Sequence, residues 1–268
     1  MNTTDNKKKC KIRNCPLPVM FDSDTYDLLL STELICNKSA SKSTEQMRNL
    51  LRHPDYAGEE TFFTFYEGVM DKKDVDLFKE NMLRYDIIVV WPGIIGDEYK
   101  KTSGHYHCEV PGQELSYPEI YEVMQGNALF ILQKCNANGD IVEVFAVRGN
   151  PGDKLVIPPG YGHVTTNIGN EPLIFADLVS SKCSNIYGQI GRNRGMSYYV
   201  VKDDERGFRL IKNPAYQAVP EAKLTHISEN YVLGIWKDRP IYSEFVNTPT
   251  LFEYLNKPVN YIDKFIEF

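Results

Sequence analysis

The chain has 268 residues, of which 42% are hydrophobic and 25% are charged, values that are ordinary for a globular protein. Its formal net charge of −6 argues against general nucleic-acid binding, because neutralising phosphates requires clustered Lys and Arg. We find no apolar run near the roughly 18 residues that span a bilayer, and no apolar segment typical of a signal peptide. We therefore expect a cytoplasmic protein without membrane or nucleic-acid partners.

The length is suited to one main domain with extensions, since all-β barrels of this size form single domains. We expect an N-terminal extension over residues 1–84, partly helical and packed on the barrel. A barrel over 85–214 and a C-terminal extension over 215–268 follow. The six cysteines lack the repeated CxxC spacing of a zinc module, and we expect them to be free thiols.

The first predicted elements are helices. Ser43 and Gln46 match the capping-box pattern, which predicts a short helix that stops before Pro54. A second helix is predicted over residues 71–83, where apolar residues recur every three or four positions.

From Tyr85 onward, short β-rich runs alternate with turn signals, a pattern typical of a sandwich or barrel. Asn138 and Gly139 predict a hairpin turn between two of these runs. The predicted strands cover residues 86–91, 120–124, 128–133, 141–147, 154–157, 173–179 and 196–201. Beyond about residue 209 the pattern weakens, and we expect a strand at 231–236 and a terminal helix within 250–268.

Three of the five histidines lie in two short β-rich segments. The first segment, Thr-Ser-Gly-His-Tyr-His, carries His105 and His107. Strand alternation would place both imidazoles on one face, where they could clip a metal ion. Two solvated or hydrogen-bonded histidines would produce the same pattern.

The second segment carries His163 in the spacing G-x5-P-x-G-x2-H-x3-N. The fixed positions are Gly152, Pro158, Gly160, His163 and Asn167. This spacing resembles the second sequence motif of the cupin superfamily at every fixed position. The resemblance implies a mainly β fold, the cupin double-stranded β-helix or jelly-roll barrel, with His163 facing inward.

The first cupin motif normally pairs the two histidines with a carboxylate six residues before a glycine. Glu119, followed by Gly126, supplies this half, although the gap after His107 is enlarged to eleven residues. The competing carboxylates are Glu109, Glu114 and Glu122. Because positions three apart on a strand face opposite sides, we place Glu119 inward and Glu122 on the outer face.

The expected metal ligands are therefore His105, His107, Glu119 and His163. Three imidazoles and one carboxylate suit a single divalent transition metal, Fe²⁺, Mn²⁺, Ni²⁺ or Zn²⁺, with positions left open for water or substrate. The sequence does not select among these metals.

Further matches narrow the resemblance. They lie at Pro92-Gly93, 102–107, Pro118 to Tyr121, Gly126, Leu132-Gln133, 156–163, 166–172 and Tyr187-Gly188. Together they resemble the cupin-type (archaeal-type) glucose-6-phosphate isomerases. That family implies an aldose–ketose isomerisation of a sugar phosphate, with glucose 6-phosphate and fructose 6-phosphate the leading pair, in glycolysis or gluconeogenesis.

The resemblance also implies roles for individual residues. Glu119 would transfer a proton or assist a hydride shift, with Tyr121 beside it on the inward face. Substrate contacts are expected at Thr102, Gly104, Tyr121 and Tyr187. The chain departs from the family pattern at Ile88, Val179 and Asn185, where a threonine, a tyrosine and a histidine are expected. These departures leave the exact sugar open.

Two other functions fit the same residues. The chain could be another cupin metalloenzyme, an oxygenase or an epimerase, or a non-catalytic sugar-binding cupin that keeps the metal for structure.

We expect a homodimer, because cupins commonly cover their exposed strands by pairing with a second subunit.

Overall fold

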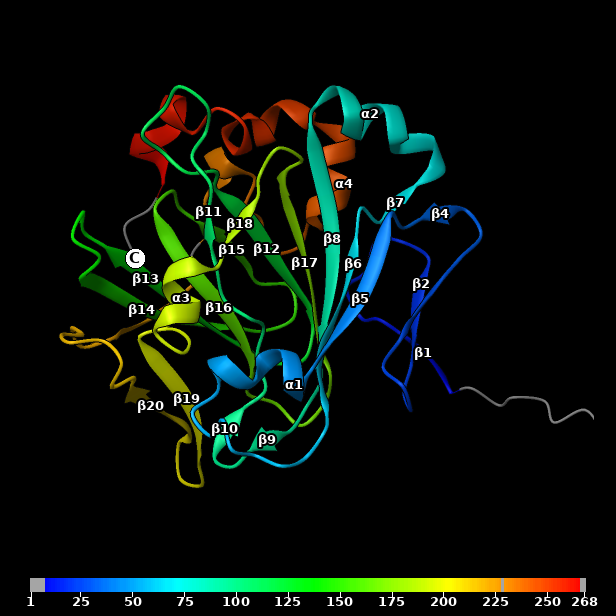
Figure 1. Cartoon of the computed structure of the whole chain (residues 1–268). Coiled ribbons are helices and arrows are strands. Elements are labelled where there is room, and N and C mark those ends of the chain that lie inside the picture. The colour runs from blue at the N-terminus through cyan, green and yellow to red at the C-terminus, as the bar shows by residue number, and fades with distance from the viewer. Residues whose placement is uncertain (1–7, 228, 266–268) are drawn as a thin grey trace, which may run out of the picture.

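A computed structural model of the chain describes residues 8–227 and 229–265 and shows two facing β-sheets (Figure 1). The six-stranded sheet has the order β15-β12-β17-β8-β6-β5 and is antiparallel throughout. Its strands are β5 Lys38–Ser43, β6 Thr61–Glu67, β8 Leu83–Val90, β12 Glu119–Gln125, β15 Lys154–Ile157 and β17 Leu173–Ser180.

The four-stranded sheet lies opposite and has the order β16-β13-β14-β21. Its strands are β13 Ala128–Cys135, β14 Ile141–Gly149, β16 Tyr161–Asn167 and β21 Lys223–His226. The turn between β13 and β14 contains Gly139 at a φ of 86°, a left-handed conformation that glycine adopts without strain. The hairpin predicted at Asn138-Gly139 is therefore confirmed.

Smaller sheets surround these two. They are β1-β2-β3 (Lys9–Lys11, Val19–Asp22, Leu28–Leu30), β4-β7 (Leu34–Ile35, Met70–Asp71), β20-β19-β10-β9 (Gly207–Lys212, Tyr198–Asp203, Glu98–Tyr99, Ile94–Ile95) and β11-β18 (Tyr106–His107, Asn185–Ile186). The last of these pairs brings two loop regions together beside β16.

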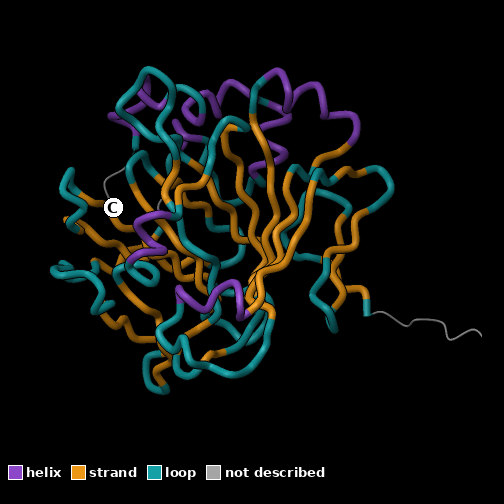
Figure 2. The backbone as a smooth tube through the Cα atoms, in the orientation of Figure 1, coloured by secondary structure: helices purple, strands orange, loops and turns teal. Residues whose placement is uncertain are grey.

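The helices are short, and several gather at one end of the molecule (Figure 2). They are α1 Thr44–Met47, η1 Arg48–Leu50, η2 Lys72–Asp74, α2 Val75–Glu80, α3 Gly188–Arg192, η3 Tyr231–Leu233, α4 Ile241–Asn247, η4 Pro249–Leu255 and η5 Pro258–Lys264. Both arms of the expected capping box are present at α1, between Ser43 and Gln46.

Alternation along the strands divides the buried side chains among three main clusters. The interior between the two sheets holds residues such as Val123, Phe130 and Phe175. The outer face of the six-stranded sheet packs under β1–β3 and the C-terminal helices α4 and η4. The outer face of the four-stranded sheet packs against β19 and its neighbours. Both sheets are thus covered on their outer faces.

All seven predicted strands are present, within a few residues of the expected ends. The strand expected at 231–236 is wrong, because that segment begins with the 3-10 helix η3. The terminal helix is wrong as one continuous element: the described part forms η4 and η5, and residues 266–268 lie outside the described residues. Pro249 and Pro258 begin these two short helices, since proline is tolerated in a first turn but not in a helix interior.

The segment before residue 84 contains short helices, as expected, but also β5 and β6 of the larger sheet. The domain boundaries at residues 84 and 214 stay predictions. All six cysteines are free, as expected.

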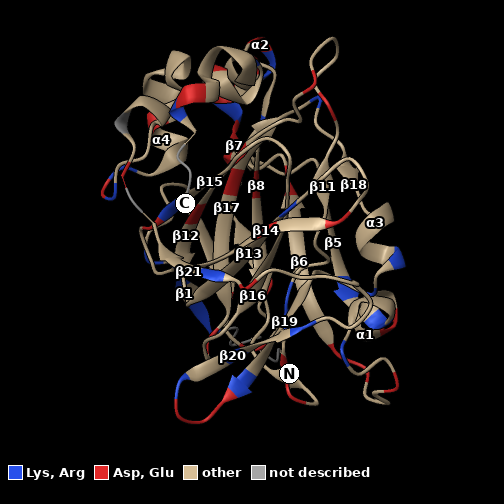
Figure 3. Cartoon of the chain, turned by 90° about the vertical axis from the view of Figure 1, so that its left-hand side faces the viewer, with Lys and Arg blue, Asp and Glu red and all other residues tan. Residues whose placement is uncertain are grey.

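Charged residues of both signs are scattered over strands and loops (Figure 3). Among the described helices, none combines the length and apolarity needed to cross a membrane.

Candidate functional site

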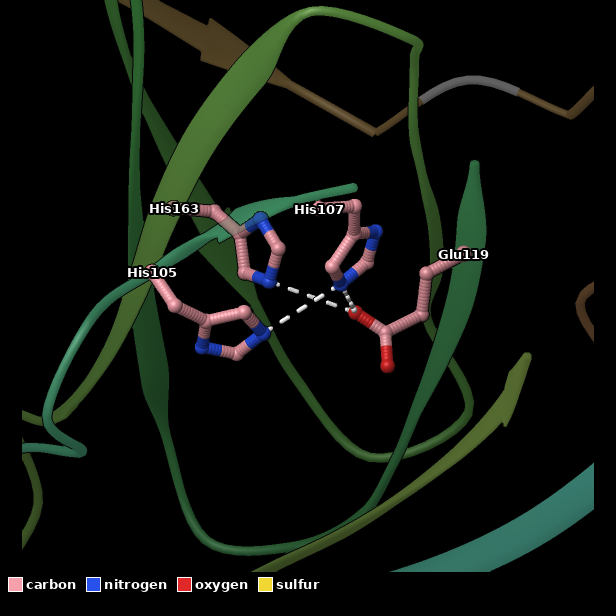
Figure 4. A group of neighbouring side chains, drawn as sticks. All are labelled: His105, His107, Glu119 and His163. Carbon is pink, nitrogen blue, oxygen red and sulfur yellow. Dashed lines mark hydrogen bonds and ion pairs between the residues drawn. The ribbon is translucent and has the colours of Figure 1, made fainter. Parts of the chain in front are cut away.

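Four side chains from different elements meet near one end of the interior (Figure 4). Glu119 begins β12, His107 ends β11, and His163 lies on β16. His105 precedes β11 and is paired with His163 through two backbone hydrogen bonds, of 3.1 and 2.9 Å. We call His105, His107, Glu119 and His163 the His/Glu group.

The nitrogen and oxygen atoms of this group converge on one point, as Figure 4 shows, and one from each residue lies within 4.8 Å of all the others. Glu119 Oε2 is 3.2 Å from His163 Nε2 and 3.5 Å from His107 Nε2. Glu119 Oε2 and His163 Nε2 are also buried and lack a well-aligned hydrogen-bond partner among the described residues. Buried polar atoms without partners are costly, and a cation at the convergence point would satisfy both. The His/Glu group therefore fits a metal ion.

A backbone contact orients the imidazole of His107. Its Nδ1 lies 2.8 Å from the carbonyl oxygen of Tyr117, to which Nδ1–H can donate. That tautomer leaves the lone pair on Nε2, which is the atom that faces Glu119.

The environment also favours the protonation states that metal binding requires. Burial lowers the pKa of His105 well below its usual value and lowers the pKa of His107 to about 4. Burial opposes the charge of Glu119, but the adjacent imidazoles of His163 and His107 together lower its pKa to about 2. Neutral imidazoles beside an ionised carboxylate are suited to ligation.

The expected substrate residues lie at different distances from the His/Glu group. Tyr121 is buried on the same face of β12 as Glu119, with its ring centroid 5.6 Å from that of His163. Tyr187 is 49% exposed, with its ring centroid 5.7 Å from that of His105. The hydroxyl of Thr102 accepts a hydrogen bond from the amide of Thr165 and is thus partly engaged.

Gly104 lies beside the group in a conformation that restricts its replacement. Its φ of 71° is left-handed, and a Cβ there would lie 3.4 Å from the carbonyl oxygen of His163. The left-handed conformation, rather than a lack of space, therefore favours glycine at this point.

The competing carboxylates lie elsewhere. Glu109 and Glu114 are exposed, in the loop between β11 and β12. Glu122 is buried on the opposite face of β12, where it forms an ion pair with Lys154 at 3.3 Å and accepts a hydrogen bond from the amide of Ile241 at 2.8 Å.

The three departures from the expected pattern occupy distinct surroundings. Ile88 is buried in the interior cluster. Val179 packs with Val110 and Tyr117, which belong to the enlarged loop or its end. Asn185 is exposed, and its amide donates to the hydroxyl of Tyr187 at 3.2 Å.

Three charged residues near the group were not anticipated. Arg84 and Asp86 on β8 and Asp177 on β17 share the interior face with Glu119, as the strand registers show. The sequence feature that could have indicated them is the presence of charged residues within otherwise apolar strands, with Arg84 and Asp86 two positions apart. The alternation alone leaves open which face they occupy.

The family model described as glucose-6-phosphate isomerase (GPI) matches residues 43–217, which is more than half of the chain. The chain belongs to the glucose-6-phosphate isomerase family. Membership confirms the family resemblance and the expected enzyme class, a sugar-phosphate isomerase. Together with the two facing β-sheets, it also confirms the mainly β cupin fold.

Individual relatives in the glucose-6-phosphate isomerase family share about three residues in ten with the chain. The glucose-6-phosphate isomerase of Thermococcus onnurineus is 29% identical over 207 residues, covering 76% of this chain and 97% of the relative. That of Thermococcus litoralis is 31% identical over 140 residues, covering 52% of this chain and 67% of the relative. That of Sinorhizobium medicae is 29% identical over 168 residues, covering 60% of this chain and 74% of the relative.

Solved structures similar to this family member include an oxalate oxidase, with a TM-score of 0.33, 16% identity and coverage of 44% of this chain and 50% of that one. An oxalate decarboxylase of Bacillus subtilis has a TM-score of 0.33, 19% identity and coverage of 48% of this chain and 29% of that one. Neither likeness bears on function.

Proposed function

We propose that the chain is a metal-dependent aldose–ketose isomerase, with glucose 6-phosphate and fructose 6-phosphate as the leading substrate pair. The observation that carries the proposal is the His/Glu group with Tyr121 beside it, in a chain whose family is named for this reaction.

His105, His107, Glu119 and His163 would hold the metal. Their mixed nitrogen and oxygen donors suit Fe²⁺, Mn²⁺, Ni²⁺ or Zn²⁺. When bound, such an ion polarises the hydroxyl and carbonyl oxygens of a sugar.

Glu119 is the residue we assign to the transfer step. An ionised carboxylate beside the reacting carbons can accept a proton from one carbon and return it to its neighbour, through an enediol. A hydride shift between the two carbons is equally compatible with Glu119 and Tyr121. Running the reaction in D₂O separates the two, since proton transfer introduces deuterium into the product and a hydride shift does not.

Tyr121 would orient the sugar. Burial raises the pKa of its phenol well above the usual value, so the hydroxyl stays protonated and can donate a hydrogen bond to a sugar oxygen. Thr102, Gly104 and Tyr187 remain the proposed contacts for the rest of the substrate. The Thr102 hydroxyl accepts a bond from Thr165, and no described residue accepts a bond from it, so it can donate to the substrate.

The test is interconversion of glucose 6-phosphate and fructose 6-phosphate by protein reconstituted separately with Fe²⁺, Mn²⁺, Ni²⁺ and Zn²⁺. Glu119→Gln should abolish turnover, whereas Glu109→Gln, the same change at an exposed loop position, should not. Inactivity of wild-type protein with metal bound would overturn the proposal for this substrate pair.

A second function is favoured by the apolar side chains of Ile88 and Val179, which remove expected polar contacts. Oxygen consumption that depends on Fe²⁺ would indicate a cupin oxygenase instead. Binding of a sugar without turnover would indicate a non-catalytic cupin.

The homodimer and the cytoplasmic location stay predictions. Sedimentation equilibrium tests the homodimer.

A further inference from the structure

Three neighbouring strands place a second polar cluster beside the His/Glu group. In the register of the six-stranded sheet, Glu119 on β12 pairs with Val179 on β17, which pairs with Arg84 on β8. Directly paired residues project from the same face of a sheet, so Arg84 and Glu119 face the same side. Strands lie about 4.8 Å apart, which puts the two backbone positions about 10 Å apart.

The next position on the same face of each strand, two residues along, shows the same arrangement. Tyr121 pairs with Asp177, and Asp177 pairs with Asp86. Asp177 is buried, and its Oδ1 has no hydrogen-bond partner among the described residues. A carboxyl oxygen left in this state on an interior face is ready to accept a bond from a hydroxyl group.

The carboxylate of Asp86 holds the guanidinium of Arg84 through its Nε atom. The Nε of Arg84 donates to both carboxylate oxygens of Asp86, at 2.8 and 3.0 Å, and Asp86 also accepts from the amide of Gly68 at 2.8 Å. Among the described residues, no hydrogen bond engages the two terminal NH₂ groups of Arg84. Its side chain is 25% exposed and can be reached from solvent.

The three lysines that are buried among the described residues are already engaged. Lys154 belongs to the opposite face and pairs with Glu122. Lys100 pairs with Glu60 at 2.6 Å, and Lys101 pairs with Glu98. Arg84 thus keeps free donors beside the His/Glu group, in the planar fork that binds an anionic oxygen pair well.

We infer that Arg84 is a specificity-determining residue that contacts the anionic group of the substrate. Asp86 holds the guanidinium in place, and Asp177 accepts a bond from a sugar hydroxyl between the anionic group and the reacting end. The span from Glu119 to Arg84 matches an open-chain sugar phosphate that reaches across β17. Val179 lies between Glu119 and Arg84, where the family pattern has a tyrosine. Arg84 would supply the polar contact to the substrate that this valine cannot make. This inference rests on the proposed function of the same site.

The test is calorimetric binding of glucitol 6-phosphate, which cannot isomerise, and of glucitol, which lacks the phosphate, to metal-loaded protein. Arg84→Met should weaken binding of glucitol 6-phosphate at least tenfold and leave binding of glucitol unchanged. Arg84→Lys should recover part of the loss, because it restores the charge but not the fork. Arg209→Met, the same change at an exposed position of β20, should have no effect.

Arg84→Met leaves Asp86 buried without its partner and could impair folding. The double variant Arg84→Met with Asp86→Asn removes both charges and keeps an acceptor for Gly68, so it should fold and show the same selective loss. Equal binding of glucitol 6-phosphate by wild type and the double variant would overturn the inference, as would equal weakening of both ligands. Selective binding without isomerisation by wild type would overturn the proposed reaction alone.

Discussion

Glu119 carries the negative charge of the His/Glu group, and its replacement should act first on metal affinity. Glu119→Gln keeps the shape of the side chain but removes the anionic oxygen that lies 3.2 Å from His163 Nε2. We expect affinity for Mn²⁺ or Zn²⁺ to fall at least tenfold, because a neutral amide is a poorer ligand than a carboxylate. Equilibrium titration measures this, with Glu109→Gln as the control. Unchanged affinity would exclude Glu119 as a ligand.

Glu122 lies three residues away on the same strand, and its replacement should act on stability instead. Glu122→Gln leaves the ammonium of Lys154 buried beside a neutral amide. Breaking one partner of a buried ion pair costs about 3–5 kcal/mol, so we expect a loss of this order in the free energy of unfolding. Urea denaturation measures the loss. Metal affinity should stay within a factor of two, and a large drop would contradict the separation of the two faces.

The C-terminal helix α4 is tied to the beginning of α2 by one hydroxyl group. Tyr242 donates to the carboxylate of Asp74 at 2.7 Å and accepts from the amide of Asp71 at 2.9 Å. Tyr242→Phe removes both bonds and leaves a buried acceptor unsatisfied, which costs about 1–3 kcal/mol. Chemical denaturation should show this loss with metal affinity retained. A change of less than 0.5 kcal/mol would mean that apolar packing alone holds α4.

The elements differ in how well the sequence predicts them, and the reason is physical. Strands such as β12 and β17 are predictable because each is a short run of β-forming residues between turn residues. The His/Glu group was predictable because each of its residues belongs to a short motif with fixed spacing. Arg84, Asp86 and Asp177 were missed, since their proximity depends on the register between β8 and β17, which no local pattern encodes. The segment at 231–236 has strand-like composition, but in the fold it begins with η3.

The whole molecule should respond to acid through the buried imidazoles when no metal is bound. The pKa of His107 is lowered from 6.5 to about 4, chiefly by burial, so between these values the unfolded chain binds a proton that the folded chain does not. Stability from this residue is fully present above pH 6.5 and is lost as the pH falls towards 4. The loss is about 3 kcal/mol.

The contribution of His107 can be isolated by comparison. Burial raises the pKa of Asp86 to about 6, an effect that acts in the opposite direction over part of the same range. Metal-free wild type and His107→Asn share the Asp86 contribution, so it cancels in their difference. That difference in the free energy of unfolding should shift in favour of His107→Asn as the pH falls from 7 to 4. A difference that does not change with pH would contradict the prediction.

The loop between β11 and β12 lies between two of the four residues in the His/Glu group, yet its length is free to vary. His107 is held by Tyr117 and β18, and Glu119 is held by β15 and β17, so neither position depends on the path between residues 109 and 116. Extra residues can be accommodated there without disturbing the sheet, whereas one extra residue inside β12 would exchange its two faces. Proteins with this fold can therefore gain new binding surfaces by changing this loop, while the positions of the metal-binding residues beneath it stay the same.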